Sequence, residues 1–271
     1  MNFPRRFVEL SGSVMSVIDV GSGPAVFLGH GWLCDAAMWS EQINALSRRF
    51  RIIAPDMWGH GLSARLPKGT SSMVDLARQH LAVLDSLDVK KAALIGFSLG
   101  GLWAGELALL APERVSALIL MATSLGAEPP ASRDAYLAVV DTIGDTGKIA
   151  PELANSLVSL FYSEAFQTSA PHIVDAHRGR LEGWRADRLR DSVAPIGHLI
   201  FNRRDALADL KTLETPILCM AGMDDRALAP ARVASMAETI GSRFLSLPHA
   251  GHLLPQEAGP DINTLLADFL Q

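Results

Sequence analysis

The chain has 271 residues, of which 49% are hydrophobic and 20% are charged, and its formal net charge is −5. This composition is ordinary for a globular protein, and the length suits one large domain or a domain that carries an insertion. The negative net charge argues against nucleic acid or an anionic membrane surface as the main partner. The sequence contains no run of about 18 apolar residues, so no transmembrane helix is predicted.

Two cysteines, Cys34 and Cys219, are present. Two cysteines without a disulfide or zinc pattern are typical of a reduced, cytosolic protein. Arg5-Arg6 lie near the N-terminus as in some export signals, but polar residues such as Glu9 soon interrupt the apolar stretch that such a signal needs. The sequence therefore predicts a cytoplasmic protein.

The first half of the chain alternates short apolar segments with amphipathic ones. In chain order, the predicted strands are residues 6–10, 14–20, 25–28, 51–55, 92–95 and 115–122, with a turn at Ser11-Gly12. The predicted helices are residues 38–50, 73–87 and 102–110, the last ending before Pro112. Strands that are almost wholly apolar are buried on both faces, as in a parallel sheet covered by helices.

This alternation stops between residues 128 and 210. Pro129-Pro130 mark the boundary, and residues 131–143, 151–161, 172–182 and 186–201 are predicted as helices with no strand among them. The alternation then resumes with strands at 216–221 and 243–247 and helices at 230–240 and 261–270. We therefore expect a core domain of residues 1–127 and 211–271, interrupted by a helical insertion over 128–210 that is longer than an ordinary connection.

A Gly-x-Ser-x-Gly pentapeptide, Gly96-Phe97-Ser98-Leu99-Gly100, joins a predicted strand to a predicted helix. A serine on such a sharp turn is held in a strained backbone conformation with its hydroxyl projecting outward. A hydroxyl hardly ionises near neutral pH, so a nucleophilic Ser98 needs a base within hydrogen-bond reach and an acid that orients that base.

The chain offers both groups directly after its last two predicted strands. Asp224 and Asp225 follow the strand at 216–221, and His249 and His252 follow the strand at 243–247. Because the loops at the carboxyl ends of parallel strands gather at one edge of a sheet, these side chains can meet Ser98 there. The chain order Ser, Asp, His is that of the α/β-hydrolases.

On these residues the chain resembles α/β-hydrolase fold enzymes over nearly its whole length. The motifs that carry the resemblance are, in order, His30-Gly31-Trp32, Asp56-Met57-Trp58-Gly59-His60-Gly61, Gly96-Phe97-Ser98-Leu99-Gly100-Gly101, Gly222-Met223-Asp224-Asp225 and Gly251-His252. The resemblance implies an α/β fold with a mostly parallel sheet flanked by helices. It also implies that the insertion is a helical cap over the active site.

Catalytic roles follow from the resemblance. It implies that Ser98 is the nucleophile and that His252, which directly follows the glycine of its motif, is the base, with His249 as the alternative. It favours Asp225 as the acid. Asp224 is the alternative, and its non-catalytic role would be to accept backbone N–H bonds in the turn.

The resemblance also implies an oxyanion hole formed by the backbone N–H groups of Trp32 and Leu99. His30 is then expected to shape the loop that carries Trp32. For Asp56 and His60 we expect a role in stabilising their own turn. No metal or organic cofactor is implied.

The identity of the nucleophile narrows the reaction. Related enzymes that open epoxides or cleave carbon–halogen bonds carry an aspartate where this chain has Ser98, so we expect an acyl-enzyme on the serine oxygen. The predicted function is hydrolysis of carboxylic esters, thioesters or lactones. The alternatives are a carbon–carbon bond hydrolase or cofactor-free perhydrolase on the same triad, and a non-catalytic ligand-binding protein on a hydrolase scaffold.

Substrate and partner are less constrained. Residues 96–124 resemble both pimeloyl-carrier-protein methyl ester esterases and 3-oxoadipate enol-lactonases, so the predicted partner is a small ester, either free or bound to a carrier protein. Seven apolar cap residues line an acyl pocket or pack the cap onto the core: Leu137, Val140, Leu157, Leu160, Phe161, Phe166 and Phe201.

The cap also carries a mixed run of charges. Seven arginines form either a solvated helix face, together with five acidic residues, or a basic surface for an acidic carrier protein or a carboxylate substrate. These arginines are Arg178, Arg180, Arg185, Arg188, Arg190, Arg203 and Arg204.

Overall fold

The computed structural model of the chain describes residues 3–10 and 12–271. Its centre is an eight-stranded sheet with the strand order β1-β2-β4-β3-β5-β6-β7-β8. The strands are β1 (Arg5–Leu10), β2 (Ser13–Val20), β3 (Ala25–Gly29), β4 (Arg51–Pro55), β5 (Ala92–Phe97), β6 (Val115–Met121), β7 (Ile217–Gly222) and β8 (Arg243–Leu247). β2 pairs antiparallel with both β1 and β4, and all other pairs are parallel.

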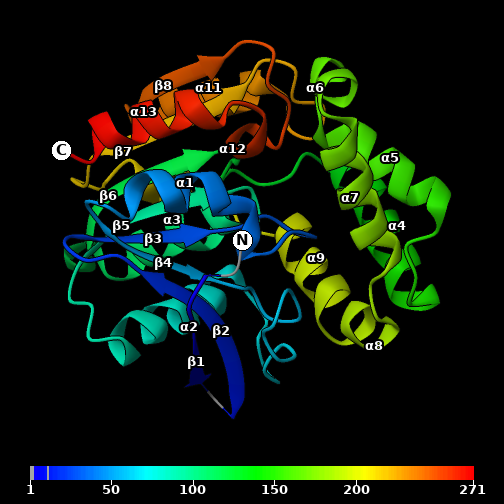
Figure 1. Cartoon of the computed structure of the whole chain (residues 1–271), viewed down its shortest axis with the longest axis horizontal. Helices are drawn as coiled ribbons and strands as arrows, with labels where there is room; N and C mark the ends of the chain where they lie inside the picture. The colour runs from blue at the N-terminus through cyan, green and yellow to red at the C-terminus, as the bar shows by residue number, and fades with distance from the viewer. Residues whose placement is uncertain (1–2, 11) are drawn as a thin grey trace.

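Helices cover both faces of this sheet, as the apolar strands predict (Figure 1). Successive residues of a strand point to opposite faces. Thus Leu28 of β3 packs with α1 (Ser40–Leu46) and α13 (Gly259–Phe269), whereas its neighbour Phe27 belongs to the core under the other helices. Those other helices are α2 (Met73–Ser86), α3 (Leu99–Leu110) and α11 (Pro230–Ile240).

Residues 128–210 contain helices and no strand among the described residues. They form α4 (Pro130–Thr146), α5 (Pro151–Phe161), α6 (Glu164–Ser169), α7 (Pro171–Glu182), α8 (Ala186–Arg188), a π-helical turn (Leu189–Val193), α9 (Ala194–Phe201) and α10 (Leu207–Leu210). Figure 1 shows α4 to α9 gathered on one side of the molecule, next to the sheet. We refer to this segment as the cap. Within the described part of the chain, no helix is long and apolar enough to cross a membrane.

Several element boundaries differ from those expected. The predicted helix 38–50 is a 3₁₀ turn (Ala36–Trp39), capped where Asp35 Oδ1 accepts from Ala37 N at 2.9 Å, followed by α1. Helix α3 begins at Leu99 rather than at residue 102. The predicted helix 186–201 contains the π-helical turn, and the short helices α6, α10 and α12 (Leu254–Glu257) were not expected. Helices of four to six residues are too short to display a helical period.

The turn expected at Ser11-Gly12 falls partly outside the described residues, since Ser11 is not among them. Gly12 has a φ of 75°. That left-handed conformation is one that glycine adopts without steric cost.

Candidate active site

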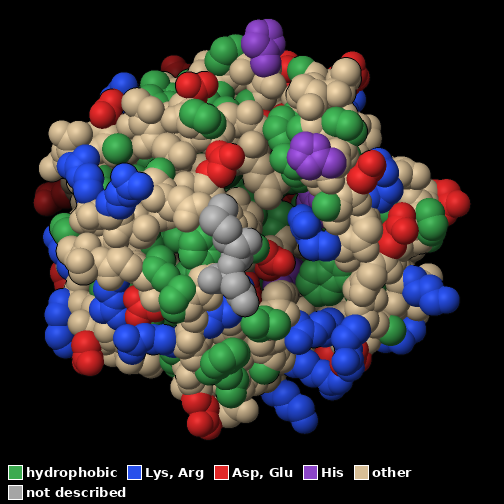
Figure 2. Space-filling view, in the orientation of Figure 1, with side chains coloured by type: hydrophobic (Ala, Val, Ile, Leu, Met, Phe, Trp, Pro, Cys, Tyr) green, Lys and Arg blue, Asp and Glu red, His purple; other side chains and the backbone are tan. Residues whose placement is uncertain are grey.

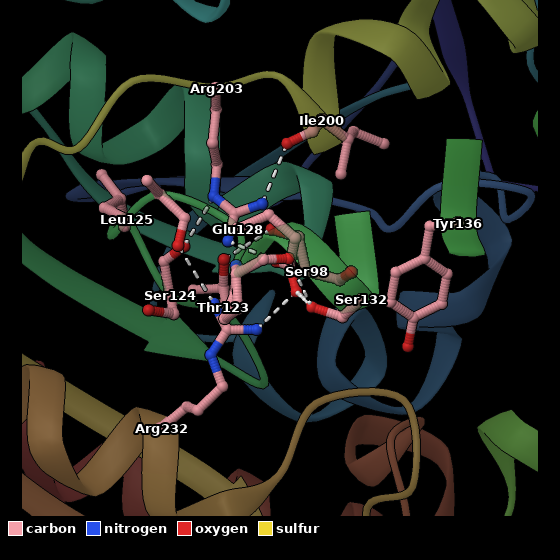
Figure 3. Close-up of polar contacts among 12 residues, drawn as sticks. Ser98, Thr123, Ser124, Leu125, Glu128, Ser132, Tyr136, Ile200, Arg203 and Arg232 are labelled. Atoms are coloured by element: carbon pink, nitrogen blue, oxygen red, sulfur yellow. Dashed lines mark hydrogen bonds and ion pairs between the residues drawn. The ribbon is translucent and has the colours of Figure 1, made fainter. Parts of the chain in front are cut away.

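Ser98 sits at the turn between β5 and α3 with φ 50° and ψ −116°. This left-handed conformation is strained for a residue with a side chain, and the surrounding backbone holds it in place. Ser98 N donates to Met121 O at 2.9 Å. Thr123 Oγ1 donates to Ser98 O, also at 2.9 Å (Figure 3). The neighbouring strand β6 and the residues that follow it therefore fix the turn from one side.

The glycines around Ser98 are required by close backbone contacts. A Cβ atom on Gly96 would lie 2.4 Å from Gly101 Cα, and one on Gly100 would lie 2.1 Å from Gly29 O. Contacts this short do not occur for real Cβ atoms, so α3 can approach β3 and β5 only with glycine at both positions. The pentapeptide is thus explained by packing as well as by chemistry.

Asp225 and His252 form a buried hydrogen-bonded pair beyond the ends of β7 and β8. His252 Nδ1 lies 2.8 Å from Asp225 Oδ2, and Asp225 Oδ1 accepts from Ala227 N and Leu228 N, both at 2.8 Å. An ionised carboxylate only accepts hydrogen bonds, so the Nδ1 atom carries the proton and Nε2 is left with its lone pair. This is the tautomer that a general base needs.

Two aromatic rings flank the imidazole of His252. The ring centroids of Phe97 and Phe161 lie 5.0 Å and 5.8 Å from that of His252, the latter with an interplanar angle of 28°. Phe97 precedes Ser98 in the core, and Phe161 ends α5 of the cap. Core and cap therefore both contact the imidazole.

The two alternative residues lie differently. Asp224 and His249 are both exposed, and His249 has a φ of 60°. The expectation that Asp224 accepts the turn N–H groups is wrong, because Asp225 Oδ1 accepts them. The geometry thus sets Asp225 and His252 apart from their neighbours.

Ser98 and His252 line the same cavity, which has a volume of about 300 Å³. Among the described residues, the Ser98 hydroxyl and the His252 imidazole form no hydrogen bond with each other. Such contacts are often loose in ligand-free enzymes and tighten when substrate binds. The structure therefore joins His252 to Asp225 and places Ser98 and His252 on one cavity, without a hydrogen bond between these two side chains.

Of the two candidate oxyanion donors, Trp32 lines the cavity and Leu99 directly follows Ser98. Leu99 is the first residue of α3, so its N–H is one of those that a helix leaves without an intrahelical partner. Trp32 N has no hydrogen-bond partner within the described part of the chain. The Trp32 indole Nε1 donates to Val193 O of the π-helical turn at 2.8 Å, which ties this loop to the cap.

Two buried histidines brace the Trp32 loop. His30 Nδ1 donates to Gly31 O and its Nε2 accepts from Met57 N, both at 2.7 Å. His60 Nε2 accepts from Leu33 N at 3.2 Å. Burial lowers the pKa of both histidines, that of His60 to about 3. Both imidazoles are therefore neutral near pH 7, and their hydrogen bonds fix the conformation of the loop that carries Trp32.

Asp56 is also a structural acceptor in this region. Its buried carboxylate accepts from Arg5 Nη1 at 2.6 Å and from the backbone N–H groups of Ala36 and Leu62, each at 2.9 Å. A Cβ atom on Gly61 would lie 2.3 Å from the Cγ atom of Asp56, so only glycine fits beside this carboxylate. Asp56 thus holds its own turn against the start of the chain and the Trp32 loop.

The cavity wall is mostly apolar and comes from both core and cap. Of the seven apolar cap residues named above, Leu157, Leu160, Phe161 and Phe201 line it. Leu137, Val140 and Phe166 are not in the lining. Tyr136 and Val139, which the sequence did not single out, are in it. Phe166 instead stacks on the Tyr162 ring with centroids 5.4 Å apart. Which face of a cap helix meets the cavity depends on how the helices pack on the core, so sequence periodicity could not identify the lining.

Most of the cap arginines make contacts within the molecule. Arg188 Nη1 donates to Gly59 O and Gly61 O, Arg190 Nη2 donates to Thr146 O, and Arg204 pairs with Glu106. Arg178 and Arg185 pair with aspartates of their own helices or turns. Figure 2 shows mainly basic side chains where Figure 1 places α8, and Asp187 of that helix pairs with both Arg65 and Arg185. These contacts favour the solvated, internally paired face over a surface free to receive an acidic carrier protein.

Arg203 and Glu128 form a buried clasp at the base of the cap (Figure 3). Arg203 Nη2 donates to Glu128 Oε2 at 2.8 Å, and their side chains are 6% and 5% exposed. Arg232 of α11 binds the other carboxylate oxygen at 2.7 Å, and Ser132 Oγ donates to it at 2.6 Å. Glu128 lies where the chain enters the cap and Arg203 follows its last long helix, so the clasp joins both ends of the insertion to the core.

We expect Glu128→Gln to lower the free energy of unfolding by about 3–5 kcal/mol at pH 7, because it leaves the Arg203 charge buried without its partner. Burial opposes ionisation of Glu128, but hydrogen bonds from Arg232, Ser132 and Arg203 outweigh it and lower the pKa of the carboxyl. The stabilisation is therefore present above the unfolded pKa of about 4.3 and is lost as the pH falls through the lower folded value.

Thermal melts of the wild type and Glu128→Gln between pH 3 and pH 7 check this expectation. The difference between their Tm values should shrink at the acid end. The exposed Glu113→Gln serves as the matched control and should melt with the wild type throughout. A constant Tm difference over the whole range would contradict the pH dependence.

The comparisons with known proteins agree with this architecture. The family model described as alpha/beta hydrolase fold matches residues 24–258. The dihydrolipoyllysine-residue acetyltransferase component of the acetoin cleaving system of Pseudomonas putida is 32% identical over 97% of this chain and 68% of its own. The pimeloyl-[acyl-carrier protein] methyl ester esterase of Aeromonas hydrophila is 29% identical over 88% of this chain and 92% of its own. A thermophilic esterase from Thermogutta terrifontis superposes with a TM-score of 0.87 at 26% identity, covering 98% of each chain.

Proposed function

This chain belongs to the α/β-hydrolase fold family, and we propose that it is a serine hydrolase that cleaves carboxylic esters with Ser98 as nucleophile, His252 as base and Asp225 as the orienting acid. The observation that carries the proposal is the buried His252–Asp225 pair at 2.8 Å, whose His252 lines the same cavity as Ser98. The relatives named as esterases support the same reaction class.

The mechanism follows from the tautomer of His252. Its unprotonated Nε2 takes the proton of Ser98 as the hydroxyl oxygen attacks the ester carbonyl carbon, and it returns that proton to the leaving alkoxide. Asp225 keeps the imidazole in this tautomer and stabilises the imidazolium while it exists. A water molecule, activated by His252 in turn, then cleaves the acyl-enzyme and releases the acid.

The N–H groups of Trp32 and Leu99 are the proposed donors to the tetrahedral intermediate. Leu99 N also benefits from the positive end of α3, where negative charge is stabilised. One such donor is worth about 2.7–4 kcal/mol of barrier in related chemistry. The two buried histidines that brace the Trp32 loop keep its donor preorganised.

The cavity indicates the size of the substrate. Its volume of about 300 Å³ is at the low end for ligand pockets. Its charged lining residues, Glu128 and Arg203, are already paired with each other. We therefore propose compact, uncharged esters as substrates, free rather than bound to a carrier protein.

A series of p-nitrophenyl esters from acetate to palmitate tests this proposal. We expect kcat/KM to be greatest for acyl chains of about four to eight carbons and to fall at least about tenfold by palmitate, whose chain exceeds the cavity. Cleavage of a vinylogous diketone and perhydrolysis activity are measured in parallel, because they test the carbon–carbon bond hydrolase and perhydrolase alternatives. Turnover of the diketone with no cleavage of any ester would contradict ester hydrolysis.

A further inference from the structure

The loop that carries His252 is bonded to the cap at the junction between α5 and α6. We define this junction as Phe161-Tyr162-Ser163. Leu253 N, directly after His252, donates to Phe161 O at 3.0 Å. Ser163 Oγ donates to His249 O at 3.1 Å. The loop is thus attached to the junction on both sides of the imidazole.

Glu257 completes this attachment from the core. It lies in α12, five positions after His252, and its Oε2 atom accepts from Gly251 N at 2.9 Å and from Ser163 N at 3.1 Å. One carboxylate oxygen therefore binds the residue before His252 and the junction together. The proposed mechanism gives Glu257 no part.

The contact is tight enough to leave no freedom at Gly251. A Cβ atom there would lie 2.5 Å from Ser163 N and 2.8 Å from Glu257 Oε1. The glycine of the Gly251-His252 motif is therefore needed for this close approach. The Glu257 Oε1 atom is itself buried with no hydrogen-bond partner within the described residues.

We propose that Glu257 is a positioning residue for His252. By binding the Gly251 and Ser163 N–H groups at once, Glu257 fixes the loop that carries His252 against the cap. This inference rests on the proposed function, in which His252 is the base. A displacement of about 1 Å at a reacting group can cost about a hundredfold in rate. The contribution of Glu257 is then to the geometry of proton transfer.

The positioning needs an acceptor oxygen rather than a charge. Burial raises the pKa of Glu257, while the hydrogen bonds from Ser163 and Gly251 oppose that rise. Both an ionised carboxylate and an uncharged carbonyl oxygen accept N–H bonds. Glutamine keeps such an oxygen on a side chain of the same shape, whereas alanine removes it.

The experiment compares Glu257→Ala and Glu257→Gln with Glu238→Gln, a matched control on the exposed face of α11. For ester cleavage we expect Glu257→Ala to lower kcat by about 10- to 100-fold with KM within about twofold. Glu257→Gln should stay within about fivefold of the wild type, and the control should be unchanged. Rates are given per folded molecule, with the folded fraction taken from circular dichroism.

Amide hydrogen exchange at Gly251 and Ser163 provides a second readout that does not require turnover. Exchange should be slow in the wild type and in Glu257→Gln and fast in Glu257→Ala. Equal exchange in the wild type and Glu257→Ala overturns the proposal, as does a Glu257→Ala enzyme of lower Tm whose kcat is unchanged. A wild type that cleaves no ester would refute the proposed function alone, since the exchange pattern still decides whether Glu257 holds the loop.

Discussion

Replacement of Ser98 by alanine is expected to lower kcat for ester hydrolysis by about 10⁴-fold or more, without loss of the fold. The acyl-enzyme forms on the Ser98 oxygen, so alanine leaves no atom for the carbonyl to bond to. The fold should persist because the contacts that hold this turn, from Ser98 N to Met121 O and from Thr123 Oγ1 to Ser98 O, involve backbone atoms of Ser98. Alanine meets the positive φ with the same strain as serine.

Steady-state kinetics with the best ester of the series, together with a thermal melt, measure this effect. Ser235, on the exposed face of α11, is not part of the cavity lining, so Ser235→Ala removes a hydroxyl from the same kind of side chain and should retain wild-type kinetics. Wild-type-like turnover by Ser98→Ala would remove Ser98 from the proposed mechanism. The oxyanion donors remain in this variant, so a small residual rate above that of the uncatalysed reaction is expected.

The second large effect is expected at the acid. Asp225→Asn should lower kcat by about 10³- to 10⁴-fold, whereas Asp224→Asn should change it less than about threefold. Three donors converge on the Asp225 carboxylate, namely His252 Nδ1 on one oxygen and the N–H groups of Ala227 and Leu228 on the other. An asparagine amide offers one acceptor oxygen and one NH₂ group, so in either orientation a donor faces a donor.

This conflict favours the wrong tautomer of His252, in which Nδ1 accepts from the amide and Nε2 carries the proton. A base in that form cannot take the proton of Ser98. The pair of variants forms its own control, because both remove one negative charge from adjacent residues of the same loop. A larger loss of kcat in Asp224→Asn would assign the acid to the exposed residue and contradict the proposed triad.

Much of the fold was readable from the chain. Short apolar strands alternating with amphipathic helices predict a covered parallel sheet, and the family comparison confirms that fold class. The interval without strands predicts the helical insertion. The 3₁₀ turn at Ala36–Trp39 and the short helices were missed, because an element of about one turn contains too few residues to show a period. The start of α3 was predicted three residues too late, because Gly100 and Gly101 in its first turn have a low helix propensity.

The site was readable only as a set of candidates. Motif spacing brought Ser98, the two aspartates and the two histidines into consideration, since strand ends share one edge of a parallel sheet. The burial of Asp225, its three donors and the exposure of Asp224 depend on the path of one turn in space. Neither the Glu128–Arg203 clasp nor the bonds of Glu257 has a local sequence signal, because their partners are distant in the chain.

The order of residues along the chain determined which strands are apolar, where the glycines allow a sharp turn and which reactive side chains follow each strand, since these properties reside in local spacing and backbone conformation. The tertiary structure alone decided which carboxylate meets His252, which cap side chains reach the cavity and how Glu257 joins the loop that carries His252 to the cap. Those outcomes depend on distances and burial between segments remote in sequence, and a hydrogen bond or an ion pair exists only once packing has brought its two partners within about 3 Å.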